Sequence, residues 1–169
     1  MRKCIIMSGP SGSGKSTWIN KQPWAPNAFV KPPWTSPAFV CSADYFFGMG
    51  ADYKFDATKL SEAHGWCLRG FIDACQGFAG DCFAGDRDND IIVVDNTNTT
   101  IEEIAPYYSI AKAYGYEVEL ITIDVPPHIA AGRNLHGVPL PSVRAMFDRI
   151  NARKIPRFWD IKCTTVFGG

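Results

Sequence analysis

A glycine-rich segment between an apolar run and a helical pattern restricts the fold of this chain more than any other feature. Residues 9–16 read Gly-Pro-Ser-Gly-Ser-Gly-Lys-Ser and match the pattern G-x-x-x-x-G-K-[ST]. The apolar run at 3–7 predicts a buried strand before this segment. A short helix is predicted after it, because Pro23 and Pro26 block a longer one. This order of strand, turn and helix lets backbone N–H groups point inward and bind phosphate.

The residues of this loop predict a nucleotide site. The nucleotide-binding residues that we expect are Gly9, Ser11, Gly12, Ser13, Gly14, Lys15, Ser16 and Thr17. Glycines let the backbone turn around phosphate oxygens, Lys15 can reach the β- and γ-phosphates, and the Ser16 hydroxyl can bind Mg²⁺. The alternative is a glycine- and serine-rich loop that matches the pattern by chance and binds no nucleotide.

Apolar runs and helical patterns alternate along the rest of the chain. Strands are predicted at 3–7, 38–44, 91–95, 117–124 and 162–167, and helices at 57–79, 101–114, 128–136 and 142–154. This alternation predicts a three-layer α/β/α fold, with helices on both faces of a five-stranded parallel sheet. Ligands of such folds bind outside the carboxyl ends of the strands, where the glycine-rich loop, Asp44 and Asp95 are all expected.

The length of the chain, 169 residues, predicts a single domain that spans 1–169. Residues 22–37 contain five prolines and three aromatic residues, and we interpret them as a loop insertion. The segment predicts either a surface flap packed by its own rings or a platform for a nucleobase or substrate.

Composition and charge argue against some classes of protein. The 17 basic and 17 acidic residues balance, so no global positive field predicts nucleic-acid binding, although a local basic groove would suffice. The six cysteines form no CxxC pair, and we expect reduced, buried thiols. The first apolar run is too short for a signal peptide, and no run has the length of a membrane span. We therefore expect a cytoplasmic protein without a membrane partner.

Two aspartates follow apolar runs and are candidates for chemistry. Asp95 ends the run IIVVD and could hold Mg²⁺ through a water molecule, or it could be a turn or helix-capping residue. Asp44 ends AFVCSAD and could accept the proton of an acceptor hydroxyl, or it could be a turn residue.

Three further patterns have a structural and a functional interpretation. His64 lies on an apolar helical stripe and is expected to be a buried core residue. The aromatic run 45–47 could stack a base or pack in the core. Arg144, Arg149 and Arg153 predict either a solvated basic face or further phosphate contacts.

Several motifs occur in one order along the chain: GPSGSGKST, CSADYF, LSEAHGWC, VVDNTNTT, AYGYEVELI, RNLHGVP and VRAMFDR. In this order they resemble the polynucleotide 5′-hydroxyl kinase group of P-loop phosphotransferases, from Lys3 to about Arg153. That group includes the kinase domains of phage and eukaryotic end-healing enzymes. The resemblance implies an adenylate-kinase-like P-loop fold, with a small helical lid within 126–154.

The resemblance also implies roles for single residues. ATP is the implied phosphate donor and Mg²⁺ the implied metal ion, held by Ser16 and, through water, by Asp95. Lys15 keeps its role at the phosphates, Asp44 matches the general base, and Arg133 matches a lid arginine that contacts the donor phosphates. Asn96 matches the second member of a strand-end pair near the phosphates.

One departure from the family concerns the acceptor. Members of the group often carry an arginine a few residues beyond the base, but the stretch YFFGMG here has no basic residue. His136 occupies the region of a second lid arginine. Our leading interpretation is transfer of the γ-phosphate to the 5′-hydroxyl of DNA or RNA. The alternatives are a kinase for a small molecule or modified nucleotide, and a nucleotide-binding regulatory module.

Overall fold

The structure, a computed structural model, describes residues 2–25, 38–77 and 90–168. Its elements in chain order are β1 (Lys3–Ser8), α1 (Lys15–Asn20), β2 (Ala38–Cys41), the 3-10 helices η2 (Ala43–Phe47), η3 (Gly50–Asp52) and η4 (Ala57–Lys59), α2 (Leu60–Cys75), β3 (Ile91–Val94), α3 (Ile101–Ala113), β4 (Glu117–Asp124), α4 (Pro127–Arg133), α5 (Leu140–Ala152) and β5 (Ile161–Phe167). Most of the proline-rich segment predicted at 22–37 lies outside the described residues.

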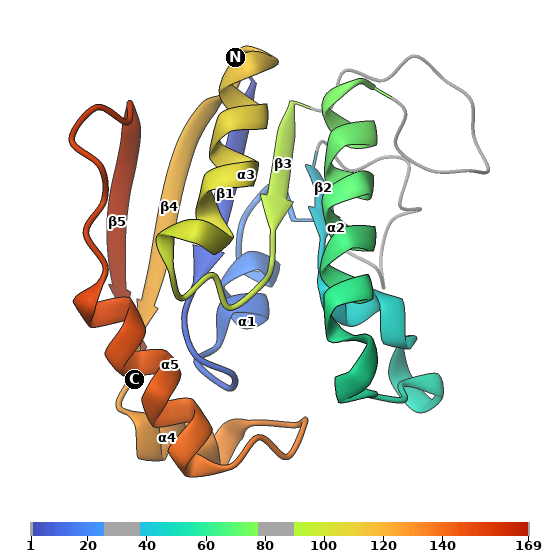
Figure 1. Cartoon of the computed structure of the whole chain (residues 1–169), viewed down its shortest axis with the longest axis vertical. Helices are drawn as coiled ribbons and strands as arrows, with labels where there is room; N and C mark the ends of the chain where they lie inside the picture. The colour runs from blue at the N-terminus through green and yellow to red at the C-terminus, as the bar shows by residue number, and fades with distance from the viewer. Residues whose placement is uncertain (1, 26–37, 78–89, 169) are drawn as a thin grey trace.

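The five strands form one parallel sheet in the order β2-β3-β1-β4-β5 (Figure 1). The strand before the glycine-rich loop is central, with β3 on one side and β4 on the other. Because all strands run the same way, their carboxyl ends meet at one edge, which lies at the bottom of Figure 1. The loop that follows β1 therefore lies beside the segments that follow β2 and β3.

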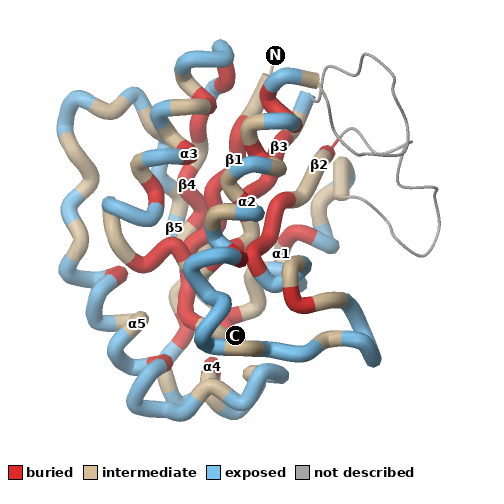
Figure 2. The backbone as a smooth tube through the Cα atoms, turned by 45° about the vertical axis from the view of Figure 1, so that its right-hand side comes forward, coloured by how far each residue is buried: buried red, intermediate tan, exposed pale blue. Residues whose placement is uncertain are grey.

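Helices cover both faces of the sheet, so the predicted three-layer fold is confirmed. Alternate residues of β1 pack on opposite sides: Cys4 and Ile6 face α2 and α3, whereas Ile5 and Met7 face Ile19 of α1. Burial on both faces explains why the inner strands β1 and β3 are apolar almost throughout, whereas polar residues occur along β4 and the edge strand β5. Figure 2 shows this buried centre between the exposed outer surfaces of the helices.

The second strand is shorter than the sequence predicted. It ends at Cys41, and Asp44 belongs to the 3-10 helix η2 that follows. The Ser42 hydroxyl accepts a hydrogen bond from the Asp44 backbone N–H at 3.3 Å and caps this helix. A local side-chain bond of this kind competes with strand pairing, which an apolar pattern does not reveal.

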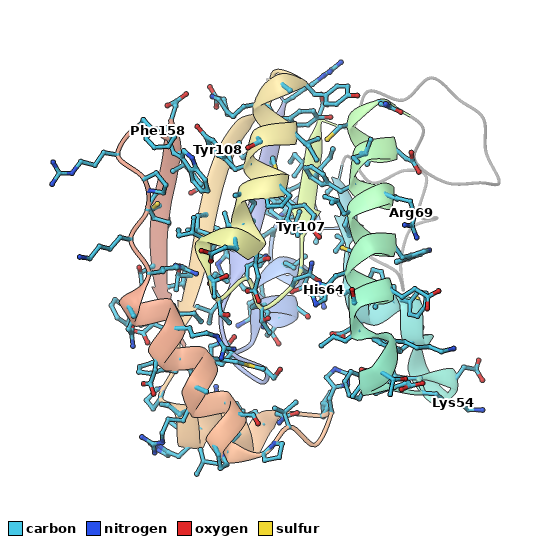
Figure 3. The ribbon with its side chains drawn as sticks, viewed as in Figure 1. Lys54, His64, Arg69, Tyr107, Tyr108 and Phe158 are labelled. Carbon is cyan, nitrogen blue, oxygen red and sulfur yellow. The ribbon has the colours of Figure 1, made fainter. Side chains whose placement is uncertain are left out.

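His64 is exposed, so its predicted place in the core is wrong. The buried positions of α2 are Ala63, Cys67, Phe71, Ala74 and Cys75. On an ideal helix His64 has the same angular position as this stripe, between Phe71 and Cys75, but it lies near the N-terminal end of α2, where Leu60 is exposed as well (Figure 3). The expected burial of the thiols holds for Cys4, Cys41, Cys67 and Cys75, whereas Cys163 is exposed and Cys82 lies outside the described residues.

The ends of α3 follow their sequence signals. The Thr100 hydroxyl accepts from the Glu103 backbone N–H, and the Glu103 carboxylate accepts from the Thr100 N–H at 3.2 Å, which is a capping box. Gly115 follows the helix with a φ of 80°, a conformation that a glycine adopts without strain. In the described parts of the chain, no helix combines the length and the apolar character needed to cross a lipid bilayer.

Candidate active site

A cavity of about 590 Å³ lies at the carboxyl edge of the sheet. Its lining includes the glycine-rich loop, Asp44 after β2, Asp95 after β3, Arg133 at the end of α4 and His136 after it. The structure thus brings together all the residues that the sequence singled out for catalysis, although they come from four separate segments.

The glycine-rich loop has a conformation that only glycine adopts without strain at its central positions. Gly12 has a φ of 81° and Gly14 a φ of 96°. A Cβ atom at Gly12 would lie 2.0 Å from the backbone oxygen of Ala130 in α4, so this turn also packs directly against the lid region. A Cβ atom at Gly14 would meet no atom within 4 Å. The requirement at Gly14 is therefore conformational, and the requirement at Gly12 is both conformational and steric.

Lys15 folds back over the loop that carries it. Its Nζ donates to the backbone oxygens of Gly9 at 2.9 Å and Pro10 at 3.1 Å. Burial lowers the pKa of Lys15, and the negative charges of Asp95 and Asp44 oppose that shift. The energetic cost of removing the Lys15 ammonium group from water would be reduced further by an anionic ligand in the cavity, and a polyphosphate is such a ligand.

The hydroxyl group of Ser13 provides a second indication that the loop fits phosphate. Among the described residues, its oxygen is the buried side-chain polar atom without a hydrogen-bond partner. Buried polar groups in native proteins are nearly always paired, so an unpaired one in a cavity wall points to a ligand. The donors available in this loop, an ammonium group, hydroxyls and backbone N–H groups, suit phosphate oxygens.

Ser16 and Asp95 lie together as the sequence predicted. The Ser16 hydroxyl donates to Asp95 Oδ2 at 2.7 Å. Burial raises the pKa of Asp95, whereas the Lys15 charge and the Ser16 hydrogen bond lower it. A hydroxyl and a carboxylate oxygen at the mouth of a phosphate loop are the ligands that Mg²⁺ prefers, so this pair fits the implied metal ion.

Asp44 and Asp95 are connected through a side chain that the sequence analysis missed. The Ser42 hydroxyl donates to the Asp95 backbone oxygen at 2.9 Å and also accepts from the Asp44 N–H. The Asp95 N–H in turn donates to the Cys41 oxygen at 2.8 Å. Asp44 itself is exposed to the cavity, with 56% of its side chain accessible. The backbone that carries the two carboxylates is thus fixed, while the exposed Asp44 carboxylate stays accessible to a ligand in the cavity.

The side chain of Asn96 is bonded to the turn that carries Asp44. Its Oδ1 accepts from the Ala43 N–H at 2.9 Å, and its Nδ2 donates to Tyr107 OH at 3.3 Å and Cys67 Sγ at 3.4 Å. The side-chain amide is therefore paired within the protein, although Asn96 is also one of the residues that line the cavity. Asn96 thus positions the segment of Asp44, and its implied place near the phosphates stays a prediction.

Arg133 and His136 approach the cavity from the lid region. Arg133 is the last residue of α4 and is exposed. His136 Nε2 lies 3.9 Å from Asp44 Oδ2. The end of α4 and the segment that follows it therefore form one wall of the cavity, next to Asp44.

Arg153 stabilises the strand ends below the glycine-rich loop. Its guanidinium group donates to the Ser8 hydroxyl, to the Asn98 oxygen at 2.7 Å and to the Thr122 hydroxyl at 2.7 Å. Burial lowers the pKa of Arg153 from its ordinary value. One side chain thus connects the end of β1, the end of β4 and the loop after β3.

Neither interpretation of the arginine pattern applies to all three residues. Arg144 is exposed, as a solvated face predicts, whereas Arg149 Nε donates to the Thr99 hydroxyl at 3.0 Å. Arg153 is the C-cap residue of α5 with extended backbone angles, so its side chain leaves the helical pattern. No local signal in the sequence marks such a change.

A family model described as an AAA domain matches residues 4–136. NEDD4-binding protein 2 of Homo sapiens is 29% identical over 148 residues, which are 85% of this chain and 7% of that protein. The chain thus spans a small part of the length of this curated relative.

Two solved structures illustrate the likeness of fold. A chain of the AvrRxo1-ORF1:AvrRxo1-ORF2 complex with ATP superposes with a TM-score of 0.63 at 20% identity, over 90% of this chain and 48% of that one. The APS kinase CysC of Mycobacterium tuberculosis, in complex with AMPPNP and APS, superposes with a TM-score of 0.52 at 18% identity, over 97% of this chain and 88% of that one. At such identities the likeness concerns the fold alone, which is a three-layer α/β/α fold around a five-stranded parallel sheet.

Proposed function

Since the chain belongs to the AAA domain family, we propose that it is a phosphotransferase that moves the γ-phosphate of ATP to a hydroxyl group. The observation that carries this proposal is the exposed Asp44 carboxylate in the cavity that also holds Lys15 and the glycine-rich loop. Binding of a nucleotide needs only the loop. A free carboxylate opposite the loop adds a proton acceptor, which a transfer reaction uses.

The donor site follows from the loop and its neighbours. Backbone N–H groups of residues 9–17 hold the β- and γ-phosphates, and Lys15 exchanges its bonds to the loop oxygens for bonds to phosphate oxygens. Ser16 and Asp95 would hold Mg²⁺, Asp95 through water, and the bound ion would neutralise charge on the β- and γ-phosphates.

The transfer step assigns Asp44 the role of general base. The acceptor oxygen attacks the γ-phosphorus in line with the bond to ADP, the new O–P bond forms, and ADP leaves with the electrons of the broken bond. The hydroxyl proton goes to the Asp44 carboxylate. Arg133 donates to the oxygens of the transferred group, where negative charge is spread in the transition state.

The acceptor that we propose is the 5′-hydroxyl of DNA or RNA. The ordered motifs from residue 9 to 149 support it, because they resemble those of polynucleotide 5′-hydroxyl kinases. A second candidate is a small molecule or modified nucleotide, which is favoured by the lack of a basic residue between Asp44 and Gly50. The third candidate is a nucleotide-binding regulatory module. Such a module would not need an exposed carboxylate at position 44.

The test is a panel of acceptors incubated with ATP labelled at the γ-phosphate. It includes single-stranded DNA and RNA oligonucleotides with 5′-hydroxyl ends, the same oligonucleotides with 5′-phosphate ends as matched controls, nucleosides, and no acceptor. We expect label on the 5′-hydroxyl oligonucleotides alone. Label on nucleosides alone would support the second candidate. Binding of ATP without label on any acceptor would contradict the proposed activity and leave the regulatory module.

A further inference from the structure

A group of aromatic rings lies beside Asp44 and is only partly buried. Phe47 is buried, and its ring centroid lies 5.1 Å from that of Phe55 and 6.3 Å from that of Tyr53. Tyr53 in turn lies 4.7 Å from the ring of His136. We call Phe47, Tyr53, Phe55 and His136 the aromatic platform.

The platform exposes apolar area that a folded chain would normally bury. Phe55 is 52% exposed, and its ring contacts the buried ring of Phe47. Single exposed apolar residues are common, but an exposed ring that continues a ring cluster up to His136, a residue of the cavity lining, indicates a binding surface. The platform is formed by the segment between η2 and η4 together with the lid segment, at the side of the molecule where Figure 3 labels Lys54.

Backbone bonds hold the platform in place before any ligand arrives. Gly48 has a φ of 96°, and a Cβ atom there would lie 2.7 Å from the Asp52 oxygen, so the chain turns back tightly at this point. The Lys54 N–H donates to the Phe47 oxygen at 2.8 Å. The exposed ring of Phe55 and the partly buried ring of Tyr53 are thereby positioned against the buried ring of Phe47, which lowers the entropy cost of stacking a ligand on them.

The platform reaches the carboxylate that accepts the proton. The Tyr53 hydroxyl is within hydrogen-bonding reach of Asp44, and burial together with the Asp44 charge raises the pKa of Tyr53. On the other side His136 Nε2 lies 3.9 Å from the same carboxylate. A hydroxyl group bound at Asp44 therefore carries the rest of its molecule directly past these two rings.

The charges of this segment favour a flat, uncharged group over a phosphate. Residues 43–59 contain three acidic residues, Asp44, Asp52 and Asp56, against two basic ones, Lys54 and Lys59. No arginine is present to hold a phosphate of the acceptor. Aromatic faces bind nucleobases by stacking, with little dependence on which base is present.

We infer that the aromatic platform stacks the base of the nucleotide whose 5′-hydroxyl lies at Asp44. The ligand class is a planar base attached to a sugar with a free 5′-hydroxyl, either at the end of a polynucleotide or as a nucleoside. This inference rests on the proposed transfer to a 5′-hydroxyl, and it names the group by which the acceptor is recognised.

The experiment compares two 5′-hydroxyl oligonucleotides that differ in one base. One has an ordinary 5′-terminal nucleotide, and the other has an abasic tetrahydrofuran nucleotide that keeps the 5′-hydroxyl. For the unchanged protein we expect kcat/KM to be roughly 10- to 100-fold lower with the abasic end, since stacking of a base has about that effect. The third acceptor is a nucleoside. If its kcat/KM equals that of the ordinary oligonucleotide, the base that stacks on the platform can belong to a free nucleoside and need not belong to a polynucleotide.

A variant of Phe55 tests whether the platform causes this difference. Phe55→Leu is expected to lower kcat/KM for the oligonucleotide with an ordinary 5′ end towards the kcat/KM of the oligonucleotide with an abasic 5′ end. The kcat/KM for the abasic oligonucleotide and the affinity for ATP should not change. Phe55→Trp keeps a ring and should restore the preference. Phe158→Leu is the matched control, because Phe158 is 85% exposed before β5, on the opposite side of the molecule in Figure 3.

Two outcomes would overturn the inference, and they are distinguishable. Equal kcat/KM for ordinary and abasic ends would exclude base stacking while the proposed transfer to a 5′-hydroxyl stands. Unchanged ATP binding with no phosphorylation of any acceptor would remove the proposed function and the inference together. Because ATP binding is measured on every variant, a folding defect cannot be mistaken for a loss of stacking.

Discussion

The two halves of the cavity are built in different ways. The donor half, residues 9–17 with Asp95, is formed by backbone turns at glycines and by short hydrogen bonds such as that from Ser16 to Asp95. The acceptor half, residues 43–55 with His136, is formed by two short 3-10 helices and by contacts between aromatic rings. In the donor half the backbone supplies much of the binding chemistry, whereas in the acceptor half side chains supply it.

Because of this difference, the acceptor half can change more readily than the donor half without loss of the fold. A polyphosphate is the same ligand in every nucleotide, so a backbone loop with fixed glycines suits it. An acceptor differs between enzymes, and ring contacts on an exposed loop can change without disturbing the sheet. Hydrogen bonds through Ser42 and Asn96 hold the two halves in a fixed relative position.

The largest effect is expected in the donor half, from Lys15→Met. The substitution keeps length and apolar volume but removes the charge that meets the β- and γ-phosphates, so kcat should fall by at least roughly 10³-fold. Phosphate transfer under saturating ATP is the measurement. Lys54→Met, which removes an exposed charge in the acceptor half, is the control and should retain activity. Equal loss in both variants would mean that overall charge, and not the loop lysine, matters.

Arg133→Ala tests whether the lid belongs to the donor half. It removes a cation from the developing charge on the transferred phosphate, and kcat should fall by about 10²-fold. Thermal unfolding should stay unchanged, because Arg133 is exposed. Arg144→Ala, an exposed arginine on α5, serves as the control. A normal rate in Arg133→Ala would remove this residue from the reaction.

Asn96→Ala tests the connection between the two halves. The change leaves the buried Ala43 N–H without its acceptor and removes a donor to the Tyr107 hydroxyl, which keeps its bond to Cys67 Sγ, so the free energy of unfolding should fall by about 2–3 kcal/mol. Urea denaturation gives this value directly. ATP affinity should be affected less than the KM for the acceptor, because Ala43 directly precedes Asp44. If ATP affinity fell by more than the KM for the acceptor rose, Asn96 would act at the phosphates, near which the resemblance placed it.

The smallest effect is expected outside both halves, at the capping box of α3. Thr100→Ala removes the hydroxyl that accepts the Glu103 N–H and should lower the free energy of unfolding by about 1 kcal/mol. The transfer rate should remain at the level of the unchanged protein. A fall in rate without a fall in stability would show that the loop before α3 also takes part in the donor half.

The fold and the donor half could be predicted from the sequence because their signals are local. The apolar runs and the capping box act between residues that are close in the chain, and the glycine pattern specifies its own turn. The position of Asp44 was right in space, but its place in a 3-10 helix was not foreseen, since it depends on the hydroxyl of Ser42.

The features that were missed depend on contacts between distant residues. Arg153 binds Ser8, 145 residues earlier in the chain, and Asn96 holds Ala43, 53 residues earlier. The burial of His64 was predicted from helical spacing, which gives the side of a helix that faces the core but not how far along the helix that side is covered. Leu60 and His64, near the start of α2, share the side of the buried residues and are nevertheless exposed.

The central claim is that Asp44 acts on the acceptor and takes no part in holding ATP. It is tested most directly by Asp44→Asn, with ATP affinity measured by calorimetry and transfer measured on a 5′-hydroxyl oligonucleotide. Asp52→Asn, an exposed aspartate of the same segment, is the control. We predict unchanged ATP affinity and a fall in kcat of at least roughly 10²-fold, as expected for loss of a general base. A parallel loss of ATP affinity, or a transfer rate that does not change, would contradict the account.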